Sequence, residues 1–149
     1  MKPVKIGDIE GWLKEKNIKF EKAGQTIVIP FESTLVAIRE FSWKEGLNII
    51  EIIATVAVEV KPSLDLFRFL LERNAETPFG KFTFVEKGLD MKPTIFFTHS
   101  LLGAKLDKIE FEEALNTIIS FADFYDEKIA ELGQGKTFRD YSKEKTGGK

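Results

Sequence analysis

One long apolar stripe between residues 107 and 133 constrains the fold more than any other feature of this sequence. Its side chains recur at alternating steps of four and three residues, which places them on one face of an α-helix. The stripe consists of Phe111, Leu115, Ile118, Ala122, Tyr125, Ile129 and Leu132. Asp107 and Glu110 fit a capping box at the start of this helix, and Gly133 is a typical C-cap. We expect a long helix that covers a sheet.

A second, shorter apolar stripe runs beside the first. It consists of Ala114, Phe121 and Phe124, and it widens the apolar arc of the predicted helix. One face of the arc would cover the sheet, and the remainder would bury against a second chain. We therefore expect a homodimer that uses surface shared by this helix and the sheet.

The residues before this helix have the pattern of short strands joined by turns. Predicted strands cover 18–21, 27–29, 35–41, 47–60, 80–87 and 92–99. Helices are predicted over 8–16 and after Ser63, a suitable N-cap. The buried stripe of that second helix would be Leu66, Phe67, Leu70 and Leu71. The expected order, α-β-β-β-β-α-β-β-α, is an α+β fold with helices on one face of an antiparallel sheet.

The chain changes character after Gly133. Residues 1–133 contain no internal repeat or linker and are predicted to form one domain. Residues 134–149 are polar, with Phe138 and Tyr141 as the only anchors, and we expect a flexible tail. Five basic residues against two acidic ones give this tail a net charge of +3.

Composition excludes several classes of function. The chain has 149 residues, no cysteine and a net charge of −2, so a disulfide scaffold, a thiol nucleophile and a Cys-ligated metal are excluded, and nucleic acid is not the default partner. No apolar run approaches the roughly 20 residues of a membrane span, and the first residues lack the apolar core of a signal peptide. We expect a cytoplasmic protein without a membrane partner. Lysine outnumbers arginine, which is typical of heat-adapted proteins.

Four patterns could carry chemistry, and each is better explained by structure. Residues 133–137 end like a phosphate-binding loop, but Ala130 occupies the position of its first glycine and a helix precedes it. The aromatic strand 80–85 lacks the basic start of an RNA-recognition strand. His99 is the only histidine and has no second nitrogen ligand to share a metal. An acidic helix face could hold a hard cation but also looks like a solvated surface; it comprises Asp123, Asp126, Glu127 and Glu131. We expect no catalytic residue, no metal and no cofactor.

Several segments together resemble the YbjN-like family, which has the type III secretion chaperone-like (Tir chaperone-like) fold. The similarity extends over residues 18–132, with the segments FLLERNAETPFGKFTF, IFFTHSLLG and LDKIEFEEALNTIISFADFYDEKI. It rests on residues that close helices and open strands: Leu70, Leu71, Asn74, Gly80, Phe82, His99, Leu102, Asp107, Ala122 and Asp123. The resemblance implies a homodimeric protein that binds an extended segment of a partner protein without catalysis. The Lys-rich tail and the long strand over 47–60 depart from the family pattern.

A sheet edge can accept an extended peptide through backbone hydrogen bonds while apolar pockets take alternate side chains. The strand that ends at Pro30 is one candidate edge. The side chains predicted to contact a partner are Phe31, Phe82, Phe84, Phe121 and Phe124. The alternative is a nucleic-acid or signalling-linked regulator that uses the basic C-terminal tail.

Overall fold

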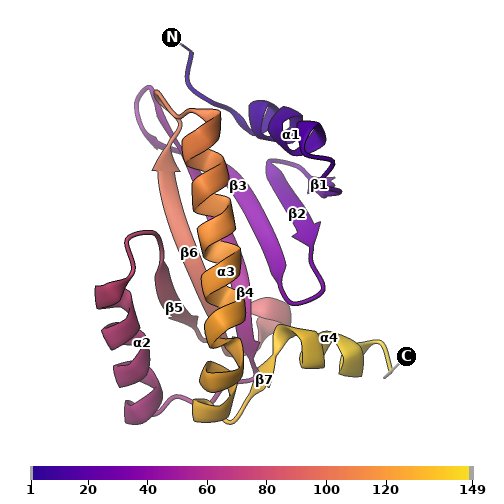
Figure 1. The fold of residues 1–149 in the computed structure, drawn as a ribbon, viewed down its shortest axis with the longest axis vertical. Coiled ribbons are helices and arrows are strands. Elements are labelled where there is room, and N and C mark those ends of the chain that lie inside the picture. Colours follow the sequence, from indigo (N-terminus) through magenta and orange to yellow (C-terminus); the bar gives the residue numbers. More distant parts are fainter. Residues whose placement is uncertain (1, 148–149) are drawn as a thin grey trace.

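Seven strands form one sheet in the computed structural model, which describes residues 2–147 (Figure 1). Every strand pairing is antiparallel, and the principal order across the sheet is β1-β2-β3-β4-β6-β5. The elements are α1 (Ile6–Glu15), β1 (Glu21–Ala23), β2 (Thr26–Pro30), β3 (Leu35–Lys44), β4 (Leu47–Val58), α2 (Leu64–Glu76), β5 (Lys81–Val85), the 3₁₀ helix η1 (Leu89–Met91), β6 (Thr94–Leu102), α3 (Lys108–Leu132), β7 (Lys136–Thr137) and α4 (Phe138–Lys145). The predicted α+β class is therefore confirmed.

Strand β4 is the centre of the sheet. Its β-branched residues alternate between the two faces, and Ile52 pairs with Ile38 of β3 on one side and with His99 of β6 on the other. Side chains of this row that point toward α3, such as those of Ile38 and Ile52, are fully buried. The two edges of the sheet are β1 and β5.

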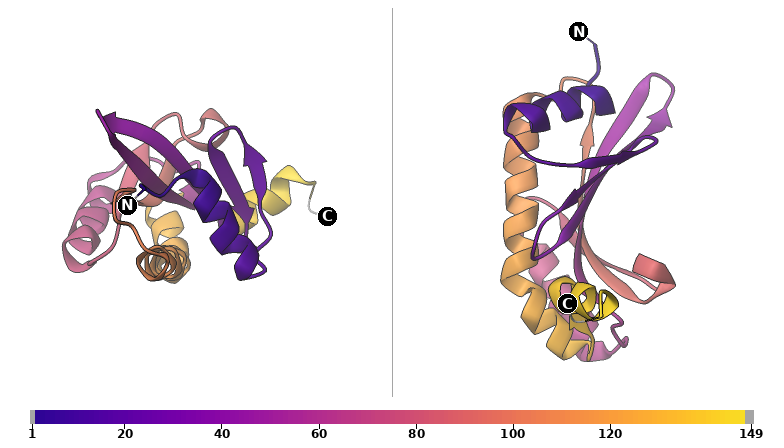
Figure 2. Two further views of the ribbon diagram at one scale, coloured as in Figure 1. Left: turned by 90° about the horizontal axis from the view of Figure 1, so that it is seen from above. Right: turned by 90° about the vertical axis from the view of Figure 1, so that its right-hand side faces the viewer.

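Helix α3 lies along one face of the sheet over most of its length (Figure 2, right). The predicted stripe points inward, with Phe111 and Ile118 almost completely buried. Asp107 is the N-cap, and its carboxylate accepts a hydrogen bond from the Glu110 backbone N–H at 2.8 Å. Ser63 caps α2 in the same way through the N–H of Leu66. The two N-cap residues and the inward face of the long helix were thus predicted correctly, whereas the Glu110 side chain does not complete the predicted capping box.

The residues after Gly133 differ from the expected flexible tail. They form β7, which pairs with the end of β4, and α4, in which Tyr141 is only 7% exposed. Helix α4 lies between the end of α3 and η1 (Figure 2, right). The partners that order this segment are 51 or more residues away in sequence, so a local pattern does not reveal them. The last two residues of the tail, 148–149, lie outside the described residues.

Candidate peptide-binding groove

An apolar groove of about 350 Å³ lies between α2 and the edge strand β5. Both elements come from the segment that links the centre of the sheet to β6. The alternation of β5 turns Phe82 and Phe84 toward the helices, and the helical period of α2 brings Phe67 and Leu71 one turn apart beside them. The lining consists of Phe67, Leu70, Leu71, Asn74, Phe82 and Phe84. Five of these six side chains are apolar, so the groove suits apolar groups.

Aromatic contacts make the floor of the groove rigid. The rings of Phe67 and Phe84 meet edge to face, with centroids 5.3 Å apart. Phe82 packs on Phe97 of β6 at 4.5 Å and on Tyr125 of α3 at 5.8 Å. Edge-to-face and tilted pairs of this kind are favoured by the ring quadrupoles. The floor is therefore fixed by β5, β6 and α3, and Phe67 of α2 packs against it.

Asn74 covers part of the backbone edge of β5. Its side-chain oxygen accepts a hydrogen bond from the Phe82 N–H at 2.7 Å, and its side-chain nitrogen donates to the Phe82 carbonyl at 3.1 Å. These backbone groups consequently point away from β6, and the alternation of an antiparallel pair directs those of Phe84 the same way. Within residues 2–147, no side chain forms hydrogen bonds to the Phe84 backbone as Asn74 does to the Phe82 backbone. The edge is thus closed at Phe82 and open at Phe84.

The predicted contact residues are distributed over three regions. Phe82 is 5% exposed and forms part of the floor, and Phe84 is half-buried in the groove. On α3, Phe121 packs against Phe97 at 5.6 Å, and Phe124 is 77% exposed beside Tyr125. Phe31 lies elsewhere, after β2, in a hollow that it shares with Arg139. The groove therefore unites two of the five residues.

Three lining residues were missed or misassigned. Leu71 was expected in a buried stripe, but it is 69% exposed, because the core side of α2 uses only Leu66 and Leu70. Phe67 was expected in the same stripe and is half-buried over the groove. Asn74 was read only as a helix end. Its position eight residues before Phe82 carries no local signal for the contact between them.

The polar candidates have structural roles. Nδ1 of His99 accepts a hydrogen bond from the Gly80 N–H at 3.0 Å, and burial lowers the pKa of the imidazole. Gly80 has a φ of +85°, and a Cβ there would lie 2.7 Å from the Phe97 ring. On α3, burial and then the nearby Asp123 and Glu127 raise the pKa of Asp126 to about 6.

The residues that the structure describes hold neither a metal-binding cluster nor a membrane-spanning helix. Among residues 2–147, no group of three or more acidic or histidine side chains is arranged to hold a metal ion. Over the same residues, no helix combines the length and apolar character needed to cross a membrane.

Comparison with known proteins identifies the class. The family model described as "T3SS (YopN, CesT) and YbjN peptide-binding chaperone 1" matches residues 15–141, so this chain belongs to that family of peptide-binding chaperones. The predicted YbjN-like resemblance is confirmed. Among solved structures, the crystal structure of YbjN, a putative transcription regulator from E. coli, aligns with a TM-score of 0.65 and 16% identity. The alignment covers 89% of this chain and 95% of that one, and it shows a shared fold. No curated protein matches the chain.

Proposed function

We propose that this chain is a non-catalytic, cytoplasmic, homodimeric protein that holds an extended segment of a partner protein along β5. The segment would pair with the open backbone groups of Phe84 and place an apolar side chain in the groove between α2 and β5. The observation that carries the proposal is the meeting of an apolar groove and an open strand edge at the same place. Membership of a family of peptide-binding chaperones is consistent with it.

The size of the groove sets the expected strength of binding. Its volume of about 350 Å³ suits one or two large apolar side chains. Burying each would contribute about 1.5–3 kcal/mol. Association costs roughly 4–15 kcal/mol in translational and rotational entropy, so backbone hydrogen bonds must supply the rest of the binding free energy. We therefore expect a weak complex at a single groove, with a dissociation constant in the micromolar range or above.

Two copies of the groove in a homodimer would strengthen binding of a longer segment through effective concentration. The exposed ring of Phe124 supports a dimer contact on α3, because aromatic side chains are enriched in protein–protein interfaces. Phe121, one turn earlier, is already packed against the sheet. We therefore assign the dimer contact to Phe124 and the partner contact to Phe84 and Leu71.

The test is peptide binding by two full-length variants. A labelled peptide of alternating apolar and polar residues is titrated against wild type, Leu71→Asp and Ile109→Asp. Leu71 and Ile109 are both exposed helix residues, at 69% and 74%, but only Leu71 lines the groove. We expect at least a tenfold loss of affinity for Leu71→Asp and no change for Ile109→Asp. Equal affinities in all three proteins would contradict the proposal.

The alternative, a regulator that uses the basic tail, has less support. Lys136 and Lys145 of the tail are paired with acidic side chains of the same chain. A nucleic acid would have to compete with these ion pairs.

A further inference from the structure

The end of β4 has an edge that β3 leaves unpaired, and the chain covers this edge with its own C-terminal segment. β6 pairs with one edge of β4 from Ile49 to Val58. β3 occupies the other edge but reaches only as far as Ala54. β7 pairs with Ala57 and Val58, and since β6 already holds the first edge, β7 continues the edge that β3 leaves (Figure 1). We call the edge of β4 beyond β3, together with Glu59 and Asp90 beside it, the slot. We call residues 135–145, which occupy the slot, the strap.

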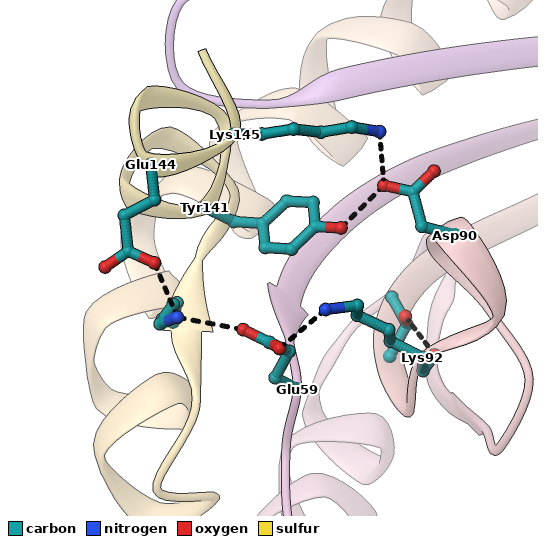
Figure 3. A network of polar contacts seen from close by, with 8 residues as sticks. Glu59, Asp90, Lys92, Tyr141, Glu144 and Lys145 are labelled. Atoms are coloured by element: carbon teal, nitrogen blue, oxygen red, sulfur yellow. Dashed lines mark hydrogen bonds and ion pairs between the residues drawn. The ribbon is translucent and has the colours of Figure 1, made fainter. Parts of the chain in front are cut away.

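Two carboxylates beside the slot hold the strap (Figure 3). The Lys136 ammonium lies 2.9 Å from the Glu59 carboxylate and also pairs with Glu144 of the strap itself. The Tyr141 hydroxyl donates to Asp90 at 2.6 Å, and Lys145 pairs with the same carboxylate at 2.7 Å. The slot thus recognises an ammonium and a phenol five residues apart.

The first residue of the strap is restricted to glycine. A Cβ at Gly135 would lie 2.6 Å from the Val58 carbonyl oxygen, a distance that real side chains do not adopt. The obstacle is backbone of the central strand, which cannot move aside cheaply. Together with Lys136 and Tyr141, this gives the slot a readable pattern, Gly-Lys-x₄-Tyr. The glycine and lysine of a sequence that only mimics a phosphate-binding loop therefore acquire a role.

The strap is weakly held. Helix α4 has eight residues, too few to be stable alone, and Tyr141 is its only buried side chain. β7 contributes only two residue pairs to the sheet. The ion pairs are partly exposed and are weakened by salt. Such a segment belongs to the least stable part of a fold and can leave while the core stays intact.

We propose that the slot is a second segment-binding site, separate from the α2–β5 groove, which the strap occupies in cis and from which a partner segment of the pattern Gly-Lys-x₄-Tyr displaces it. The partner is a basic and aromatic protein segment that pairs through a two-residue strand and then turns into a helix, as the strap does. Its lysine binds Glu59, its tyrosine binds Asp90, and its backbone pairs with Ala57 and Val58. The strap keeps the slot closed until such a segment is present at sufficient concentration.

The experiment uses full-length protein and a labelled peptide with the sequence of residues 134–147. In one variant, Lys136→Ser and Tyr141→Ser together weaken the strap. Fluorescence anisotropy should show at least tenfold tighter binding of the peptide to this variant than to wild type. The reason is that the apparent affinity equals the intrinsic affinity multiplied by the fraction of molecules whose slot is free of the strap. Adding Asp90→Asn, or replacing the peptide's glycine by alanine, should reduce that binding at least tenfold. Equal binding by wild type and the strap-weakened variant would overturn the proposal.

Two further measurements protect the test from trivial failure. In wild type, amide hydrogen exchange of the strap should quicken several-fold in 1 M salt while that of β6 stays unchanged. Equal protection of the strap and β6 would contradict a detachable strap without any variant. Adding Leu71→Asp to the strap-weakened variant should leave binding of the strap peptide unchanged, which separates this site from the groove. A parallel loss would merge the two sites and refute the proposal.

Discussion

Asn74 offers a sharp test of how the β5 edge is organised. Its side chain makes two hydrogen bonds to the Phe82 backbone, at 2.7 and 3.1 Å. Each such bond contributes about 0.5–1.5 kcal/mol net, so Asn74→Ala should lower the free energy of unfolding by roughly 1–3 kcal/mol. Because the edge is half-open to water, which can replace part of this bonding, we expect a value in the lower half of that range. Asn116→Ala, at an exposed position on α3, is the matched control and should change stability by about 0.5 kcal/mol or less.

Asn74→Asp makes the reasoning directional. The new carboxylate can still accept from the Phe82 N–H, but it faces the Phe82 carbonyl without a proton to donate. Repulsion there raises the folded-state pKa of the introduced group above its unfolded value. The variant should therefore lose stability at pH 7 and recover part of it as the pH falls and the carboxyl is protonated. Urea unfolding at pH 7 and pH 4, compared with wild type, measures this. Wild-type stability in Asn74→Ala, or no recovery of Asn74→Asp in acid, would refute the role assigned to Asn74.

Three other predictions follow from single contacts. Gly80→Ala places a Cβ at a positive φ and 2.7 Å from the Phe97 ring, so thermal unfolding should show a loss of more than about 1 kcal/mol, and a wild-type midpoint would contradict this. Light scattering should give wild type twice the mass of one chain, as a dimer requires, and Phe124→Asp a mass nearer that of one chain, whereas a dimer unchanged by the substitution would remove Phe124 from the proposed interface. Hydrogen bonds from Lys92 and Lys136 lower the folded pKa of Glu59, and those from Lys145 and Tyr141 lower that of Asp90. Protection of the strap amides should therefore be at its maximum above about pH 4.5 and be lost as the pH falls through the lowered pKa values, and protection that persists at pH 2 would show that these carboxylates do not hold the strap.

The features that the sequence predicted well are those encoded by short-range periodicity. The α3 stripe, its Asp107 cap and the Ser63 cap depend on residues three or four apart, and each has the expected structure. The antiparallel order of strands followed from short turns between them. Such signals persist because helix and strand geometry repeats at every residue.

The features that were missed depend on contacts between distant segments. Leu71 has the spacing of a core residue, but the sheet ends at β5 and leaves no partner to cover it. In the sequence, Tyr141 has only the character of an anchor in a loose tail. The fold brings Asp90, 51 residues earlier, beside it. Asn74 resembles a helix end and acts as a substitute strand partner. Each of these roles depends on contacts between segments far apart in the chain, which no local sequence pattern reveals.

The most direct test of the central claim is the protection of one amide. An apolar, strand-forming peptide is added to the full-length protein, and amide hydrogen exchange is followed at single-residue resolution by NMR. If a segment pairs with the β5 edge, exchange of the Phe84 N–H should slow at least tenfold on saturation, while the Phe82 N–H, already bonded to Asn74, should change little. Binding of the peptide without any added protection at Phe84 would contradict strand addition at this edge.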